Sequence, residues 1–432
     1  MSTIGIIAEF NPFHNGHSHL IAECKKITGA DNCIVIMSGD FVQRGTPALT
    51  DKFTRARMAL SCGADLVLEL PVYYSTGSAE YFAGGAVSIL DKLGVVDYLC
   101  FGSELGDISL MDAVADILCT EPPIYKETLA KELKKGSSFA AAREKALTET
   151  IKTSKEDAYP GLKKTGAGLK AIKSAVSSPN NILAIEYLRA LKKIRSKIKP
   201  VTIIREGSDY NSTELTSMPS ALSIRNVIGS APLSHGRLSP SSGKKVMSQL
   251  KAYIPGDALR ILFSEESRLS VSDDVSLLLK YKLLQQGAYG YEEYLDVTED
   301  ISNKILRNLE SFTGFDDFCM KIKSKDITYS RISRCLLHIL LDIRKDNMKQ
   351  YVEDSYTGYV RILGQKASAK KLLSELQDNC SLPVLNRLKD APHKLDGLQM
   401  RLFEETLRAS SVYSLLNGGD NTSEYRLKPV IM

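Results

Sequence analysis

The chain opens with an apolar run, TIGIIAE at residues 3–9, that passes directly into the polar segment FNPFHNGH at residues 10–17. A short continuous apolar run of this kind predicts a strand that is buried on both faces. Apolar residues with helical spacing follow at Leu20, Ala22 and Cys24. The polar segment therefore lies where the first strand ends and the first helix begins.

The same alternation of strand and helix continues along the chain. Further strands are predicted at 33–37, 65–70, 97–101 and 200–205, and helices at 50–62, 78–93 and 181–195. Apolar strands separated by helices indicate an α/β fold with a parallel sheet covered on both faces. Ligands of such sheets bind beyond the carboxyl ends of the strands. Those ends carry FNPFHNGH, SGDFVQRG and FGSE, so we expect a nucleotide site there.

The composition excludes several classes of protein. With 43% hydrophobic and 25% charged residues, the chain is an ordinary globular one rather than a disordered one. Eight cysteines without a CxxC pair suggest neither a disulfide framework nor a zinc ribbon. No apolar stretch reaches 18 residues, and the first residues lack the features of a signal peptide. We therefore expect a cytoplasmic protein without a membrane span.

A chain of 432 residues predicts two domains. A stretch rich in Ser, Pro and Gly at 229–244 marks the expected linker between them. The first domain then covers residues 1–230, with a polar, lysine-bearing segment at 151–178 as a flexible insertion. Residues 245–432 show mainly helical patterns and form the second domain, with a short candidate strand at 358–363.

The segment HNGH at residues 14–17 carries the clearest chemical signal. His14 and His17 are three residues apart at the start of a predicted helix, where backbone N–H groups and the helix dipole favour an anion. Both imidazoles can therefore reach one phosphate group, and Gly16 leaves room for a base or ribose against the backbone. A metal site and a purely structural polar turn are the alternatives, although no carboxylate has the HExxH spacing.

The motif HxGH after a first strand resembles that of the HIGH-type nucleotidylyltransferase superfamily. Five ordered blocks resemble the bacterial tRNA(Met) cytidine acetate ligase family more closely: EFNPFHNGH at 9–17, MSGDFVQRG at 37–45, DLVLEL at 65–70 with Pro71, FGSE at 101–104 and PNNIL at 179–183. The resemblance implies a Rossmann-like nucleotidylyltransferase domain followed by a mainly helical, tRNA-binding domain.

The resemblance also implies an activity. The implied enzyme is an ATP-dependent ligase that converts acetate and ATP to acetyl-adenylate, and then acetylates N4 of the wobble cytidine of elongator tRNA(Met). ATP is the substrate, and Mg²⁺ is the usual companion of a triphosphate. The implied catalytic residues are His14 and His17. The implied ATP site comprises Ile7, Ala8, Glu9, Phe10, Asn11, Pro12, Phe13, His14, Asn15, Gly16, His17, Ser18, His19, Leu20, Gly102, Asn180 and Arg205.

The remaining candidates concern acetate and RNA. Gln43 and Arg44 follow the second strand and are candidates for holding acetate or cytidine, with a plain structural contact as the alternative. A basic segment beyond residue 320 can follow a phosphate backbone. Charge alone favours a solvated helix face, and the family resemblance reverses that order. Its expected tRNA-binding residues are Lys323, Lys325, Arg331 and Arg334, with Tyr329 nearby for stacking.

Two other functions explain part of the same pattern. A small-molecule nucleotidylyltransferase that adenylylates a phosphorylated cofactor precursor accounts for the first 230 residues. A non-enzymatic RNA-binding protein with a degenerate nucleotide fold accounts for the basic segment. The sequence does not indicate an oligomeric state or a general base, and Ser223 and Arg225 are weaker candidates for contacting the triphosphate.

Overall fold

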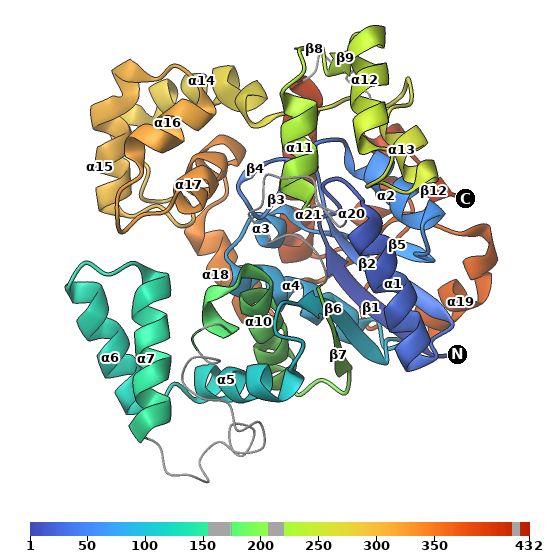
Figure 1. The fold of residues 1–432 in the computed structure, drawn as a ribbon, viewed down its shortest axis with the longest axis horizontal. Helices are drawn as coiled ribbons and strands as arrows, with labels where there is room; N and C mark the ends of the chain where they lie inside the picture. The colour runs from blue at the N-terminus through green and yellow to red at the C-terminus, as the bar shows by residue number, and fades with distance from the viewer. Residues whose placement is uncertain (154–172, 174, 206–219, 417–423) are drawn as a thin grey trace.

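An eight-stranded sheet runs through the centre of the molecule (Figure 1). The computed structural model describes residues 1–153, 173, 175–205, 220–416 and 424–432. The strand order is β11-β10-β5-β2-β1-β6-β7, and β12 pairs with β10. The strands are β1 (Thr3–Ala8), β2 (Asn32–Ser38), β5 (Leu66–Leu70), β6 (Tyr98–Ser103), β7 (Lys199–Ile204), β10 (Val360–Gln365), β11 (Val384–Leu385) and β12 (Val430–Ile431).

Helices cover both faces of the sheet because its side chains alternate between two apolar layers. Ile4 and Ile6 of β1 pack with α1 and α2 on one face, whereas Ile34 and Ile36 of β2 pack with α4 and α10 on the other. The helices of the first half are α1 (Asn15–Thr28), α2 (Lys52–Ser61), α3 (Val72–Ser75), α4 (Ala79–Lys92), α5 (Ile108–Thr120), α6 (Pro123–Lys134), α7 (Phe139–Thr153), α10 (Pro179–Lys193) and α11 (Ala221–Gly229).

The second half of the chain is mainly helical, as expected. Its helices are α12 (Pro240–Leu250), α13 (Gly256–Leu262), α14 (Ser276–Gln286), α15 (Glu299–Asn308), α16 (Phe315–Ile322), α17 (Tyr329–Leu341), α18 (Lys345–Glu353), α19 (Lys370–Asn379), α20 (Ala391–Lys394) and α21 (Gly397–Leu415). Helices α14 to α17 form a lobe beside the sheet (Figure 1), called the helical lobe below.

The prediction of an α/β fold with a parallel sheet is confirmed. Strands β1, β2, β5, β6 and β7 are all parallel, and they coincide with the five predicted runs to within a few residues. Residues 111–147, whose pattern is helical, fall within α5, α6 and α7 and the turns between them. Of the predicted insertion, residues 154–172 and 174 lie outside the described residues.

The C-terminal residues differ from the expected separate helical domain. Strand β10, which contains most of the candidate strand at 358–363, lies antiparallel to β5 in the main sheet and brings β11 and β12 with it. Without β10 this edge of β5 would lack hydrogen-bond partners, and the chain beyond residue 359 supplies them. The expected linker at 229–244 is also structured, because it holds the hairpin of β8 (Leu233–Ser234) and β9 (Arg237–Leu238).

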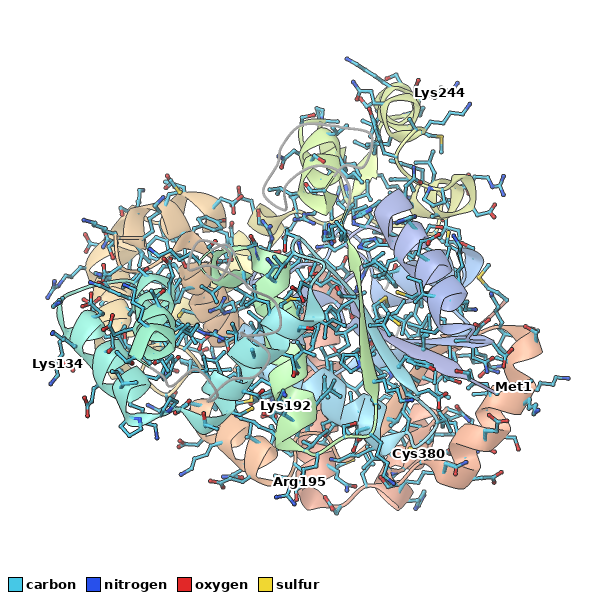
Figure 2. All side chains as sticks on the ribbon, turned by 60° about the horizontal axis from the view of Figure 1, so that its bottom comes forward. Met1, Lys134, Lys192, Arg195, Lys244 and Cys380 are labelled. Atoms are coloured by element: carbon cyan, nitrogen blue, oxygen red, sulfur yellow. The ribbon has the colours of Figure 1, made fainter. Side chains whose placement is uncertain are left out.

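Long polar side chains cover the surface of the molecule (Figure 2). Lys134 marks the end of α6, which packs with α7 as a projecting pair, and Lys244 marks α12. Within the described ranges, no helix combines the length and the apolar character that a membrane span requires.

Candidate active site

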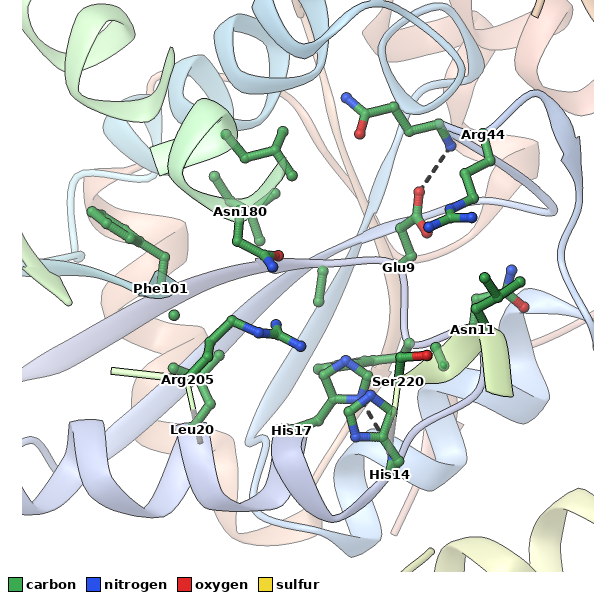
Figure 3. Close-up of a pocket in the computed structure, with 18 of the residues that line it drawn as sticks. Glu9, Asn11, His14, His17, Leu20, Arg44, Phe101, Asn180, Arg205 and Ser220 are labelled. Atoms are coloured by element: carbon green, nitrogen blue, oxygen red, sulfur yellow. Dashed lines mark hydrogen bonds between the residues drawn. The ribbon is translucent and has the colours of Figure 1, made fainter. Parts of the chain in front are cut away.

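A pocket opens at the carboxyl ends of β1 and β6, as the topology of a parallel sheet predicts (Figure 3). The N-termini of α1, α10 and α11 complete its rim. It is lined by Ile7, Ala8, Glu9, Phe10, Asn11, His14, His17, Leu20, Gln43, Arg44, Phe82, Phe101, Gly102, Asn180, Leu183, Tyr187, Arg205, Ser220, Ala221, Leu222 and Arg225. Because His14 and His17 of the HNGH segment line this pocket, we call it the nucleotide pocket below.

His14 and His17 form a stacked pair at the start of α1. Their ring centroids are 3.7 Å apart, and the rings are inclined by 28°. The backbone N–H of Gly16 donates to Nδ1 of His14 at 3.1 Å, and the backbone N–H of His14 donates to Nδ1 of His17 at 3.2 Å. Since both Nδ1 atoms accept, each neutral ring carries its proton on Nε2. Two Nε2–H donors are thus available in the pocket.

The surroundings keep both imidazoles neutral. Burial, followed by the positive charges of Arg205 and Arg225, lowers the pKa of His14 to about 3. Burial, then His14 and Arg205, hold the pKa of His17 well below its usual range. At neutral pH the pair therefore acts as hydrogen-bond donors, while the two arginines supply the positive charge that an anionic ligand needs.

Arg205 reaches the pocket across Gly102. The backbone N–H of Arg205 donates to the carbonyl of Ser103 at 2.9 Å, which extends the pairing of β6 and β7 by one residue. A Cβ atom on Gly102 would lie 2.9 Å from Cγ of Arg205. Gly102, which is expected in the ATP site, therefore also leaves the room that this arginine needs to reach the pocket.

Asn180 lies at the first turn of α10, and Glu104 holds it there. The Glu104 carboxylate accepts from Nδ2 of Asn180 at 2.7 Å and from the backbone N–H of Asn181 at 2.9 Å. A carboxylate at a helix N-terminus satisfies the free N–H groups and the helix dipole. Glu104 is thus occupied as a cap, and Asn180 is fixed at the rim of the pocket beside the apolar side chain of Leu183.

The turn after β1 is fastened from inside the protein by Arg55. This guanidinium is fully buried and donates to the carbonyls of Glu9 at 2.8 Å, Ser38 at 2.9 Å and Thr50 at 3.0 Å, and also to that of Gly39. It joins the carboxyl ends of β1 and β2, which carry two walls of the pocket. Nothing in the local sequence pattern marks Arg55 for this role.

Asn11 and Arg225 connect the same turn to α11. The backbone N–H of Leu49 donates to Oδ1 of Asn11 at 2.7 Å, and Nη1 of Arg225 donates to the Asn11 carbonyl at 2.5 Å. Arg225, a weaker candidate from the sequence, is thereby held at the pocket wall next to His14. Ser223 is buried and contacts Ser220 instead of lining the pocket.

The structure brings together most of the expected ATP-site residues. The ones that line the pocket are Ile7, Ala8, Glu9, Phe10, Asn11, His14, His17, Leu20, Gly102, Asn180 and Arg205. Those outside the lining are Pro12, Phe13, Asn15, Gly16, Ser18 and His19. The sequence missed the apolar wall formed by Phe82, Phe101, Leu183 and Tyr187, because such residues read as ordinary core. Figure 3 shows Phe101 across the pocket from Arg44.

Two residues of the motif have structural tasks instead of the expected contact with a ligand. A Cβ atom on Gly16 would lie 3.0 Å from Cε1 of His14, so this glycine makes room for the histidine ring and not for a base or ribose. Asn15 faces away from the pocket, since its Nδ2 donates to the carbonyl of Ala252 at 2.9 Å. Its backbone N–H donates to Tyr253 at 3.0 Å, which ties α1 to the segment before α13.

The expected RNA-contacting residues lie on the helical lobe. Lys323 and Lys325 are exposed in the turn between α16 and α17, and Arg331 lies half-buried on the first turn of α17. Nε of Arg334 contacts Asp296 at 3.1 Å, so part of its charge is balanced. Tyr329 is also half-buried, and its hydroxyl donates to Asp316, so it is less free to stack on a base than the sequence suggests.

The described part of the chain holds no group of three or more His, Cys, Asp or Glu side chains able to bind a metal ion. The carboxylates near the pocket have other partners. Oδ1 of Asp40 accepts from the backbone N–H of Lys52 at 2.8 Å, and Glu9 accepts from the backbone N–H of Gln43 at 2.8 Å. The polar groups that line the pocket thus include imidazoles, guanidiniums, amides and the Glu9 carboxylate.

Comparison with known proteins agrees with this geometry. A family model described as HIGH Nucleotidyl Transferase matches residues 1–427. The chain is 38% identical to a tRNA(Met) cytidine acetate ligase of Clostridium perfringens (strain SM101 / Type A), with 100% of both chains covered. It is 40% identical to one of Caldanaerobacter subterraneus subsp. tengcongensis, with 96% of this chain and 95% of the relative covered.

Two solved structures of Thermotoga maritima TmcAL share the fold over 100% of both chains at 29% identity. The TM-score is 0.88 for the apo form and 0.86 for the form bound with alpha-thio ATP. The family model, the curated relatives and the solved structures all cover nearly the entire chain. The chain thus belongs to the HIGH nucleotidyl transferase family and, within it, to the tRNA(Met) cytidine acetate ligases.

Proposed function

We propose that the chain is an ATP-dependent ligase that activates acetate as acetyl-adenylate and transfers the acetyl group to N4 of the wobble cytidine of elongator tRNA(Met). The observation that carries the proposal is the stacked pair of neutral imidazoles at the N-terminus of α1, facing a pocket that also contains Arg205 and Arg225. The name of the curated relatives supports the reaction, and the alpha-thio ATP complex of the Thermotoga maritima protein supports the nucleotide.

In the first step, a carboxylate oxygen of acetate attacks the α-phosphorus of ATP. A new P–O bond forms, the bond from the α-phosphorus to the bridging oxygen breaks, and pyrophosphate leaves with the electron pair. We assign the Nε2–H groups of His14 and His17 to the phosphate oxygens that gain charge, with Arg205 and Arg225 as fixed positive charges. Bound phosphates would raise the low pKa values of the histidines.

In the second step, the N4 lone pair of cytidine attacks the acyl carbon of acetyl-adenylate. The C–N bond forms, the bond from the acyl carbon to the phosphate oxygen breaks, AMP leaves with the electron pair, and one amino proton is released. Asp40 and Glu104 are held by Lys52 and by the start of α10, so we assign neither as a general base. Orientation of N4 against a reactive anhydride supplies the acceleration.

We propose that Mg²⁺ enters with ATP as part of the substrate. Mg²⁺ in nucleotide sites is held mainly by phosphate oxygens and water, with few protein carboxylates. A pocket whose described residues offer no three-ligand group fits that mode of binding. The adenine would lie against the apolar wall that contains Phe101 and Tyr187, whose ring centroids are 5.7 Å apart.

The tRNA is proposed to contact the helical lobe through Lys323, Lys325, Arg331 and Arg334. Two of these side chains are exposed, and all four lie within twelve positions of one another on or next to α17. Contacts of this kind bind the phosphate backbone without reading its sequence. They would bring the anticodon toward the nucleotide pocket, because α17 packs on the hairpin that follows β2.

The test is the exchange of labelled pyrophosphate into ATP, measured with and without acetate. Exchange that requires acetate, together with transfer of labelled acetate to bulk bacterial tRNA, is the expected result. Exchange that is independent of acetate but requires a phosphorylated cofactor precursor would indicate a small-molecule nucleotidylyltransferase instead. Tight tRNA binding without any exchange would select the non-enzymatic RNA-binding protein.

A further inference from the structure

We infer that Gln43 recognises the Watson–Crick edge of the cytosine that receives the acetyl group. Gln43 lies in the short loop between β3 (Phe41–Val42) and β4 (Thr46–Pro47), in the hairpin that follows β2. The inference deepens the proposed function and rests on it, because it names the residue that would hold the base in the second step.

Gln43 lies where two cavities meet. Beside the nucleotide pocket is a larger cleft of about 950 Å³, between the hairpin β3–β4, the helices α10 and α11, and the helical lobe. The residues that line both cavities are Gln43, Arg44, Leu183, Leu222 and Arg225. A group that enters the cleft reaches the nucleotide pocket past these side chains. This junction is therefore the place where a base could approach an adenylate without displacing it.

Within the part of the chain that the structure describes, the amide nitrogen of Gln43 has no hydrogen-bond partner. Nε2 is buried, and nothing in the described residues accepts a hydrogen bond from it. Buried donors are nearly always satisfied, because an unmade hydrogen bond in the interior is costly. A donor left open between two ligand cavities points to an acceptor on a ligand.

The position of Gln43 is fixed from two sides. Its backbone N–H donates to the Glu9 carboxylate at 2.8 Å, which anchors it to the end of β1. On the other side, Oγ of Ser333 on α17 donates to the carbonyl of Gly45 at 3.0 Å. Gly45 has φ of +79°, and a Cβ there would lie 2.4 Å from the backbone N of Arg334. The loop is thus clamped against α17, so the amide is presented in a defined place.

The chemistry of the amide favours cytosine over acetate. A carboxamide offers a donor and an acceptor side by side, and cytosine presents the acceptor N3 beside the donor N4–H₂. Nε2–H of Gln43 would donate to N3 while one N4–H donates to Oε1, as glutamine does with the adjacent N7 and N6–H₂ of adenine. Acetate accepts only, and it is better matched by Arg44 or Arg225. Leu183 and Leu222 add apolar surface for the planar ring.

The test compares two reactions of one variant, Gln43→Leu. The first is acetate-dependent exchange of pyrophosphate without tRNA, and the second is transfer of labelled acetate to tRNA(Met). We expect kcat/KM for transfer to fall about 10- to 100-fold relative to the exchange rate of the same variant, as for loss of a buried hydrogen bond. Gln377→Leu, an exposed glutamine on α19, is the matched control and should change neither reaction.

Gln43→Glu tests whether the side chain at position 43 must donate a hydrogen bond or only has to occupy the space. It keeps the length and the acceptor but removes the donor, and it sets a carboxylate against N3, so transfer should fall at least as far as in Gln43→Leu. Equal losses in transfer and exchange, or a raised KM for acetate in exchange, would overturn the inference and assign Gln43 to the acyl donor. Absence of acetate-dependent exchange in the unaltered chain would instead contradict the proposed function itself.

Discussion

Glu424 carries a negative charge into the interior near the end of the chain. Its carboxylate contacts Nζ of Lys52 at 2.7 Å and Nη1 of Arg361 at 2.8 Å. Both cations are buried, and both also contact Glu69 at 2.7 Å. The cluster joins residues from the first and the last parts of the chain, so removal of one charge tests how far the C-terminal segment stabilises the whole fold.

The size of the effect follows from the pKa of Glu424. Burial alone would raise this pKa, but Lys52 and Arg361 together lower it from 4.5 to about 2. At 1.36 kcal/mol for each tenfold change in the proton affinity, this difference corresponds to about 3 kcal/mol of stability. Because the folded pKa is depressed, the contribution is complete above pH 4.5 and is lost as the pH falls toward 2. Glu424→Gln keeps the shape and removes the charge.

The measurement is the free energy of unfolding from urea titrations at pH 7, 5 and 4. Glu424→Gln should be less stable than the unaltered chain by about 3 kcal/mol at pH 7, and the difference should narrow below pH 4.5. Glu310→Gln, at an exposed carboxylate, serves as the control. A difference below about 0.5 kcal/mol, or one that stays constant with pH, would refute the reasoning, since surface substitutions reach that size without any buried charge.

Three further substitutions test the proposed contacts with ATP and with tRNA. His17→Ala removes one Nε2–H donor and the acceptor for the His14 backbone, so acetate-dependent exchange should be abolished while tRNA affinity in filter binding stays close to that of the unaltered chain. Gly16→Ala places a Cβ 3.0 Å from Cε1 of His14 and so displaces the imidazole ring. The rate of exchange should fall about tenfold, with little change in the urea midpoint. A normal rate of exchange would show that the site tolerates the displaced ring. Arg331→Glu should weaken tRNA binding and reduce the slope of log affinity against log salt by about 1, whereas an unchanged slope would leave Arg331 as a solvated side chain.

The five parallel strands β1, β2, β5, β6 and β7 could be predicted because their signal is local. Each is a continuous apolar run bounded by a polar segment, and parallel order follows from the helices between them. The position of β10 could not be predicted, since its antiparallel pairing with β5 joins residues almost three hundred positions apart. A run such as VRILGQ among helices contains no information about which sheet edge it will meet.

The position of the pocket can be predicted because the HNGH motif is rare and lies at a strand end. The role of the glycines is harder to predict. Gly16 leaves space for the ring of His14, whereas the sequence predicts space for a base or ribose, and Gly102 leaves space for Arg205. A glycine in a motif signals that something lies close to the backbone, but only the folded structure shows whether that neighbour belongs to the ligand or to the protein.

The buried cluster and the sheet together explain why the chain does not divide where its composition changes. Lys52 and Glu69 come from the first quarter of the chain, Arg361 and Glu424 from the last, and none of these charges is stable in the interior without the others. The strands β10 and β12 add backbone pairing to the same edge of the sheet. The helical lobe is thus inserted between two segments of the chain that form one core. This arrangement holds α17 in a fixed place against the hairpin that carries Gln43.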